Sequence, residues 1–380
     1  MTTAIDFDLI FNAAPAQTKQ EPHICSRSNR YTFGSKPVKA IQNGQKQWLA
    51  PTGELIQGVY LDMPADDYHR IKAVSSSLVK KFAFDPHKAE RYWTGKDEFK
   101  ITPQLKRSFN AGHMFHGLVL EPHVDHGVIA PVDFETLEKS TNSTVLLDHA
   151  ALKKHIEVHG LRKGKTIAER VEIAKDHKSD LIYYPQYLDD FKRRDEQGER
   201  VLDLKDYMKV EDAVKVFKGT NLYKVDYEKG GYSELTIIAF DTERDCYVKA
   251  RIDRITSDNL MRDLKTIHSM TEANMRNELE TRLYFIQGAF YHYCCDLIGF
   301  DVVADSFSVT FVEWDDEIRF QNVSVTERTW SASKTYMLEI FDDLVLWLGD
   351  KVKKTSLNHS QSLTMQLGYY KLSRRPRVES

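Results

Sequence analysis

The sequence contains few cysteines, and their spacing forms no recognisable site. Of its 380 residues only four are cysteine: Cys25, Cys246 and the adjoining pair Cys294 and Cys295. No C-x-x-C pair occurs, which argues against a zinc site or an iron–sulfur cluster ligated by cysteine. The spacing also argues against a disulfide framework and favours reduced thiols, as in a cytoplasmic protein.

Long apolar runs are absent as well. No segment approaches the roughly 18 apolar residues needed to cross a bilayer. Residues 1–17 end in small residues, but they carry Asp6 and Asp8 and no lysine or arginine. A secretory signal begins with basic residues, so we expect a cytoplasmic protein without a membrane partner.

Net charge is also nearly absent, at −3 from 53 basic and 56 acidic residues. This value excludes a histone-like, uniformly basic binder. The average hides asymmetry, because residues 78–107 carry eight basic and four acidic side chains, whereas residues 301–320 carry six acidic ones and one arginine. The basic segment forms a local positive track suited to phosphate groups, with Lys80, Lys81 and Arg107 as candidate contacts.

Composition along the chain predicts three parts. Residues 1–55 are polar and aperiodic, which indicates a flexible or loosely packed arm. Residues 56–350 form the main domain, with a polar helical insertion at residues 131–220. Residues 351–380 form a basic C-terminal tail.

The main domain shows an α/β order of elements. Three serines before an i, i+3, i+4 apolar pattern predict a helix N-terminus at residues 75–77. Helices are expected at residues 104–120, 274–298 and 326–348, and strands at residues 235–240, 246–256, 260–267, 305–314 and 318–325.

Two neighbouring strands carry the most informative side chains. Asp263 and Lys265 lie two apart, so they project from the same face of a strand. Asp253 joins them if the two strands form a hairpin. Converging carboxylates suit Mg²⁺ or Mn²⁺, and a lysine beside such a metal can orient or deprotonate an attacking water. The alternative is a charged, solvated hairpin.

Two histidines share a face of the helix at residues 104–120. His116 is either a packed core residue or a third metal ligand from a separate element. His113, one turn earlier, is either a neighbour that supports the metal site or a group that faces DNA. Their spacing does not separate these alternatives.

Three further side chains are candidates for the surroundings of the metal. Gln287 and Tyr291 lie at i and i+4 on one helix face and can position a base or a phosphate, although an amphipathic tyrosine-rich helix gives the same pattern. Glu234 precedes the strands as a supporting carboxylate or a surface residue.

Six short motifs occur in a fixed order between residues 58 and 325. They are Asp67-Tyr68-His69; Val74-Ser75-Ser76-Ser77 followed by Pro86; Gly112-His113-Met114-Phe115-His116 followed by Val119-Leu120-Glu121-Pro122; Ala250-Arg251-Ile252-Asp253; Asp263-Leu264-Lys265-Thr266; and Gln287-Gly288-Ala289-Phe290-Tyr291. Together they resemble the P-D-(D/E)-x-K nuclease superfamily and, more closely, the exodeoxyribonuclease VIII family of phages and prophages.

The resemblance implies a restriction-endonuclease-like core, with a central mixed sheet flanked by helices. It implies a Mg²⁺-dependent exonuclease (Mn²⁺ as a possible substitute) that degrades one strand of duplex DNA from its 5′ end. The remaining 3′ strand would serve a phage annealing protein, and related enzymes form homo-oligomeric rings around DNA ends.

The resemblance also assigns roles to individual residues. His116, Asp253, Asp263 and the Leu264 carbonyl would bind the metal, and Lys265 would be the catalytic lysine. The supporting residues would be Gln287 and Tyr291, with Ser75 and Ser77 holding a phosphate at a helix N-terminus.

The chain departs from the family pattern at Met114 and His113 and in the long insertion at residues 131–220, which could alter DNA access or ring assembly. Two alternatives are a structure-specific or endonucleolytic DNA nuclease on the same fold and a non-catalytic recombination protein that binds DNA ends.

Overall fold

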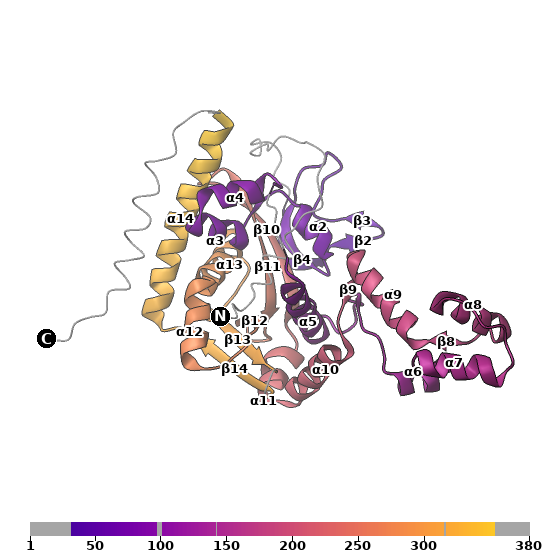
Figure 1. Cartoon of the computed structure of the whole chain (residues 1–380). Helices are drawn as coiled ribbons and strands as arrows, with labels where there is room; N and C mark the ends of the chain where they lie inside the picture. Colours follow the sequence, from indigo (N-terminus) through magenta and orange to yellow (C-terminus); the bar gives the residue numbers. More distant parts are fainter. Residues whose placement is uncertain (1–31, 97–100, 142, 315–316, 354–380) are drawn as a thin grey trace.

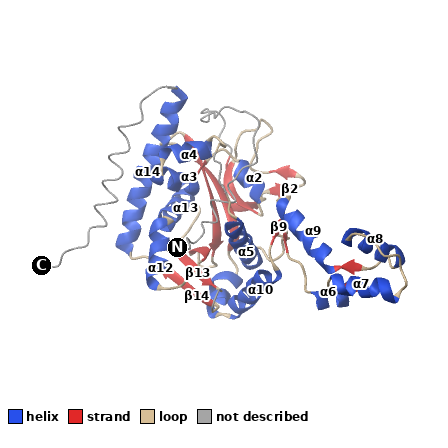
Figure 2. Cartoon of the chain, in the orientation of Figure 1, coloured by secondary structure: helices blue, strands red, loops and turns tan. Residues whose placement is uncertain are grey.

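The computed structural model describes residues 32–96, 101–141, 143–314 and 317–353, and its centre is one mixed eight-stranded sheet (Figures 1 and 2). The main strand order is β1-β4-β10-β11-β12-β13-β14, and the short β5 also pairs with β11. The pairs β1–β4, β5–β11 and β12–β13 are parallel, and the others are antiparallel. The strands are β1 (Thr32–Lys39), β4 (Gln57–Leu61), β5 (Val74–Ser75), β10 (Tyr232–Asp241), β11 (Cys246–Ile255), β12 (Met261–Thr266), β13 (Ser308–Glu313) and β14 (Arg319–Ser324).

Helices cover both faces of this sheet. Alternate side chains of a strand point to opposite faces, so Phe311 of β13 enters one apolar core and the adjacent Val312 enters another. The first core lies under α3 (Ser76–Phe84), α4 (Pro86–Trp93), α12 (Glu272–Thr281), α13 (Tyr284–Ile298) and α14 (Glu327–Lys353); the second lies under α5 (Pro103–Leu120) and α10 (Leu204–Gly219). The expected α/β class, with a central mixed sheet flanked by helices, is confirmed.

The expectation of a loose arm over residues 1–55 is wrong for residues 32–55. Strand β1 pairs in parallel with β4, and β2 (Ile41–Gln42) pairs with β3 (Gln45–Lys46). Trp48 is only 2% exposed and packs in an apolar cluster with Tyr60. A few scattered apolar side chains, with Trp48 the largest, anchor this polar segment, so it shows no regular apolar periodicity. Residues 1–31 and the basic tail from residue 354 lie outside the described residues.

The single helix expected at residues 274–298 is two helices. Helix α12 ends at Thr281, and α13 begins at Tyr284 after Leu283, whose φ of 53° is left-handed. Leu283 is buried, so core packing holds a backbone conformation that its side chain disfavours. The apolar periodicity of the sequence runs through this break, so the sequence predicts one continuous helix.

The polar insertion is helical, as expected. It contains α6 (Phe134–Thr141), α7 (His149–Val158), α8 (Ile167–His177) and α9 (Tyr184–Glu196), with β7 (Val145–Leu146) paired to β8 (Ile182–Tyr183), and it projects from the sheet (Figure 1). Helix α10 also lies in the range 131–220, but Phe217 packs on Phe115 of α5, which places α10 in the main core. No helix within the described ranges is long and apolar enough to cross a membrane.

A buried lysine on β11 predicts a pH-dependent stability. Lys249 is 4% exposed, and its Nζ donates hydrogen bonds to the carbonyls of Tyr68 (2.7 Å) and Ile71 (3.0 Å). Burial, followed by the charge of Lys72, lowers its pKa from 10.5 to about 7. Between these values only the unfolded chain holds the proton, so stability rises with pH.

We therefore expect this group to add about 2 kcal/mol to the free energy of unfolding between pH 7 and pH 9. Denaturant titrations of the wild type and Lys249→Met at both pH values measure the difference. Equal pH dependence in the two proteins would contradict the lowered pKa.

Candidate active site

The sheet places two acidic side chains opposite each other. Ser233 of β10 pairs with Arg254 of β11 and Leu235 pairs with Ile252, so Glu234 faces Asp253. Like charges in this position repel each other. Glu234 also has a φ of 49°, a left-handed conformation that is uncommon for a residue with a side chain. Such backbone strain concentrates at functional sites.

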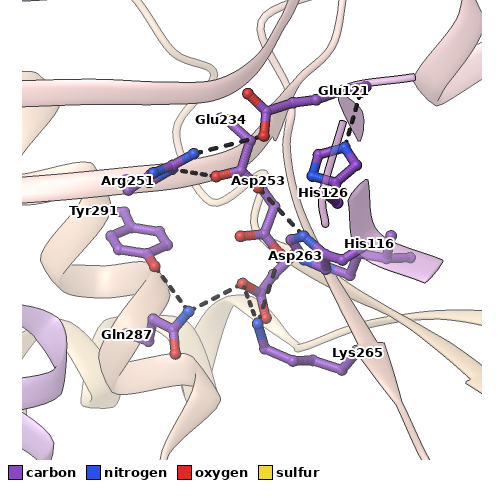
Figure 3. Close-up of polar contacts among 11 residues, drawn as sticks. His116, Glu121, His126, Glu234, Arg251, Asp253, Asp263, Lys265, Gln287 and Tyr291 are labelled. Carbon is purple, nitrogen blue, oxygen red and sulfur yellow. Dashed lines mark hydrogen bonds and ion pairs between the residues drawn. The ribbon is translucent and has the colours of Figure 1, made fainter. Parts of the chain in front are cut away.

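His116 of α5 lies between these carboxylates (Figure 3). Its Nε2 is 2.9 Å from Asp253 Oδ2, and its Nδ1 is 3.3 Å from Glu234 Oε1. Burial lowers the pKa of His116, but Asp253 and Glu234 outweigh burial and raise it to about 10. Within the described ranges, these three residues form the group whose potential ligand atoms all lie within 4.8 Å of one another.

Arg251 neutralises the acidic residues on the other side of the cluster. It forms an ion pair with Glu234, and its Nη2 is 3.6 Å from Glu121 Oε2. Burial raises the pKa of Glu234. Arg251 and then His116 lower this pKa by more than burial raises it, so it lies below its ordinary value. Glu234 is therefore ionised at neutral pH and available as a ligand.

Lys265 contacts both aspartates predicted from the sequence. Its Nζ is 3.1 Å from Asp263 Oδ1 and 3.6 Å from Asp253 Oδ2, and the lysine is 2% exposed. The Leu264 N–H donates to Asp253 Oδ2 at 2.8 Å. Burial opposes ionisation of Asp253, but Lys265, His116 and this N–H hold its pKa well below the usual range.

A chain of hydrogen bonds links this lysine–aspartate pair to α13 and α3. Gln287 Nε2 donates to Asp263 Oδ1 at 3.0 Å and contacts Tyr291 Oη at 2.9 Å. Lys80 Nζ donates to Gln287 Oε1 at 2.5 Å and lies 5.6 Å from the centre of the Tyr284 ring. Gln287 is fully buried, so these contacts fix its amide orientation.

A cavity of about 580 Å³ adjoins this cluster and is lined by His116, Glu234, Arg251, Asp253, Lys265 and Tyr291. Its volume falls in the range of small-ligand sites. The N-terminus of α3 contributes Ser75, Ser76 and Ser77, and Ser75 Oγ accepts a hydrogen bond from the Leu78 N–H at 3.4 Å. A helix N-terminus with neighbouring hydroxyls favours phosphate oxygens.

The structure brings most of the predicted residues together. The polar cluster contains His116, Asp253, Asp263, Lys265, Gln287, Tyr291 and Lys80, and the cavity lining includes Ser75, Ser77 and His113. Glu234 is buried and contacts His116 directly, so it is not a surface residue, and its role as a supporting carboxylate stays a prediction. The carbonyl of Leu264 as a metal ligand stays a prediction.

Two predicted DNA contacts lie elsewhere. Lys81 is 6% exposed, with its Nζ 4.8 Å from the centre of the Tyr92 ring. Arg107 lies on the N-terminal half of α5, 3.8 Å from Asp203 Oδ2. Neither is in the described lining of the cavity. A count of charges along the sequence identifies a basic segment, but it carries no information about the direction of each side chain.

Three residues of the site were not predicted. Arg251 lies two positions before Asp253 on β11, so the period of two would have placed both on one face. Glu121 follows α5 and reaches Arg251. His126 Nε2 lies 3.0 Å from the Glu121 carbonyl oxygen, and its ring meets His113 edge to face, a loop contact without a sequence signal. Burial, then Arg200, lowers the pKa of His113 to about 3, so His113 is neutral.

Comparison with known proteins adds little to this geometry. No family model matches the chain, and no curated protein matches it in sequence. Among solved structures, the chain is similar to a candidate exonuclease from Eubacterium rectale, with 11% sequence identity and a TM-score of 0.44. That match covers 84% of this chain and 96% of the other.

Proposed function

We propose that the chain is a Mg²⁺-dependent exodeoxyribonuclease. The observation that carries the proposal is Lys265, a buried lysine held between Asp253 and Asp263 at the edge of a cavity. The same cavity contains His116 and Glu234, so carboxylate, imidazole and ammonium groups meet where a phosphodiester can enter. This combination suits hydrolysis of a phosphate ester.

The donor set fits a hard divalent cation. His116, Glu234 and Asp253 present one nitrogen and two carboxylates within 4.8 Å, and a divalent cation would replace the proton that His116 carries between the two carboxylates. These three residues would hold Mg²⁺ or Mn²⁺, with Asp263 beside them. When bound, the ion would polarise a phosphoryl oxygen and neutralise charge that develops on it.

The side chains around the metal position have separate roles in the reaction. Lys265 orients the attacking water and stabilises the negative charge that develops on the phosphate, because its ammonium is fixed by the two aspartates. Gln287 and Tyr291 hold Asp263 in one orientation. Ser75 and Ser77 bind a phosphate of the DNA backbone through hydroxyl and N–H groups at the start of α3.

The direction of digestion and its biological setting rest on the six ordered motifs. We propose that the enzyme attacks duplex DNA at 5′ ends in the cytoplasm and leaves 3′ single strands for an annealing protein. A homo-oligomeric ring around the DNA would keep the enzyme on its substrate.

End-labelled DNA tests this proposal. With Mg²⁺, linear duplex DNA should be degraded, a 5′ label should be released before a 3′ label, and closed circular DNA should stay intact. Cleavage of closed circles would instead support the endonuclease. Binding to ends without release of nucleotides would support the non-catalytic recombination protein.

Glu234→Gln tests whether this residue is a metal ligand. The substitution removes a carboxylate from the three-residue cluster, so we expect the Mg²⁺ concentration for half-maximal cleavage to rise about 10- to 100-fold. Glu121→Gln is the matched control, because Glu121 also contacts Arg251 but lies outside that cluster. Equal effects of the two substitutions would assign Glu234 a role through Arg251 only.

A further inference from the structure

Three histidines lie close together at α7 and α8 of the helical insertion, and Figure 1 shows these two helices in the part of the chain that projects from the sheet. His155 is on α7, His159 directly follows the last residue of that helix, and His177 ends α8. Their ring centroids are 4.5 Å apart for His155 and His159, 4.8 Å for His159 and His177, and 6.1 Å for His155 and His177.

These separations match those of imidazoles that share one metal ion. Three rings bound to a tetrahedral Zn²⁺ through nitrogens at about 2.0 Å have centroids roughly 5 Å apart. His155 and His159 are also spaced i and i+4, the spacing by which one helix face supplies two zinc ligands. We propose that His155, His159 and His177 form a Zn²⁺ site that joins α7 to α8, with water completing the coordination.

The surroundings favour a cation. The C-terminal ends of α7 and α8 meet at the cluster, and each helix end carries partial negative charge. Nε2 of His155 is buried and has no hydrogen-bond partner within the part of the chain that the structure describes. Burial, followed by His159, His177 and Lys178, lowers the pKa of His155, so this ring is neutral and can act as a ligand.

Lys178 is the nearby positive charge that opposes binding. Its Nζ donates a hydrogen bond to Thr144 Oγ1 and lies 3.9 Å from Asp180 Oδ2. The acidic partner offsets part of its charge.

Binding requires the rings to turn. Within the described ranges, His116, Glu234 and Asp253 have their ligand atoms within 4.8 Å of one another. The ring nitrogens of the three histidines do not all lie within this distance of one another. His159 and His177 are exposed, so rotation about their side-chain torsions displaces solvent rather than packed neighbours.

A metal ion at this position would also stabilise the insertion. Its own apolar core is small, formed by Leu146, Leu152, Ile156, Val171, Ala174, Leu181 and Tyr183. A unit with so few buried side chains gains little hydrophobic stabilisation, and small units commonly use a metal as a cross-link. Zinc at the ends of α7 and α8 would hold this pair together.

Isothermal titration with ZnCl₂ tests the site on the full chain, expressed without a histidine tag and stripped of metal with chelator. We expect the wild type to bind one more equivalent of Zn²⁺ than the double variant His159→Gln/His177→Gln. Both substitutions are at exposed positions, and circular dichroism checks that the variant is folded. His149→Gln, which alters another exposed histidine of α7, should keep the extra equivalent.

Each of the single variants His159→Gln and His177→Gln should weaken this binding event at least about tenfold. If the double variant binds as many zinc ions as the wild type and as tightly, the proposal is wrong. The measurement needs no nuclease activity, so its outcome is separate from that of the proposed function.

Discussion

Replacing Lys265 by methionine should reduce the rate of DNA cleavage about 1,000-fold, the upper end of the loss expected when one preorganised charge-stabilising donor is removed. The methionine keeps much of the buried aliphatic chain but removes the ammonium that contacts Asp253 and Asp263. Affinity for DNA should change little, because Lys265 is 2% exposed and acts on the reacting centre. Single-turnover digestion and a separate DNA-binding assay measure the two effects.

Lys334→Met is the control for a lysine outside the cavity. The Lys334 ammonium lies 5.4 Å from the centre of the Trp330 ring and 3.3 Å from Asp305 Oδ1. Its substitution should leave the cleavage rate unchanged. A rate for Lys265→Met close to that of Lys334→Met would remove Lys265 from the chemistry.

Lys80 is the alternative candidate for the catalytic lysine, because its ammonium also lies near the site. It reaches the centre through Gln287 Oε1, whereas Lys265 touches the carboxylates directly. We therefore attribute the stabilisation of developing negative charge to Lys265 and a positioning role to Lys80. A larger rate loss for Lys80→Met than for Lys265→Met would reverse this assignment.

Local periodicity was enough to predict the lysine–aspartate pair. Asp263 and Lys265 are two residues apart on β12, and strand geometry requires them to share a face. The hairpin that brings in Asp253 followed from two apolar strands with a turn between them. Helical spacing correctly placed His116 on a helix, although its contacts with Asp253 and Glu234 required the three-dimensional packing of α5 on the sheet.

The features that were not predicted depend on contacts between residues that are far apart in the sequence. The position of Glu234 depends on the pairing of β10 with β11 and on a left-handed backbone at that residue. The helix break at Leu283 and the burial of Trp48 likewise depend on distant side chains. Local propensity carries no information about such contacts, so these features were missed.

Asp253→Asn should abolish the metal response of the protein as well as its cleavage activity. Asp253 contacts both His116 and Lys265, and asparagine retains an acceptor for the Leu264 N–H but has no charge. Metal at 100 times its dissociation constant should stabilise the wild type by about 2.7 kcal/mol, because binding favours the folded state. The variant should show almost none of this stabilisation.

Thermal unfolding with and without Mn²⁺ measures this difference without relying on DNA cleavage. Asp226→Asn is the matched control, because Asp226 is also a buried acid, but it pairs with Arg262 at 2.7 Å and lies outside the cavity lining as described. That substitution should lower the stability while leaving the response to Mn²⁺ intact. If Asp253→Asn gains as much stability from Mn²⁺ as the wild type, the metal is bound elsewhere, and the assignment of His116, Glu234 and Asp253 as its ligands fails.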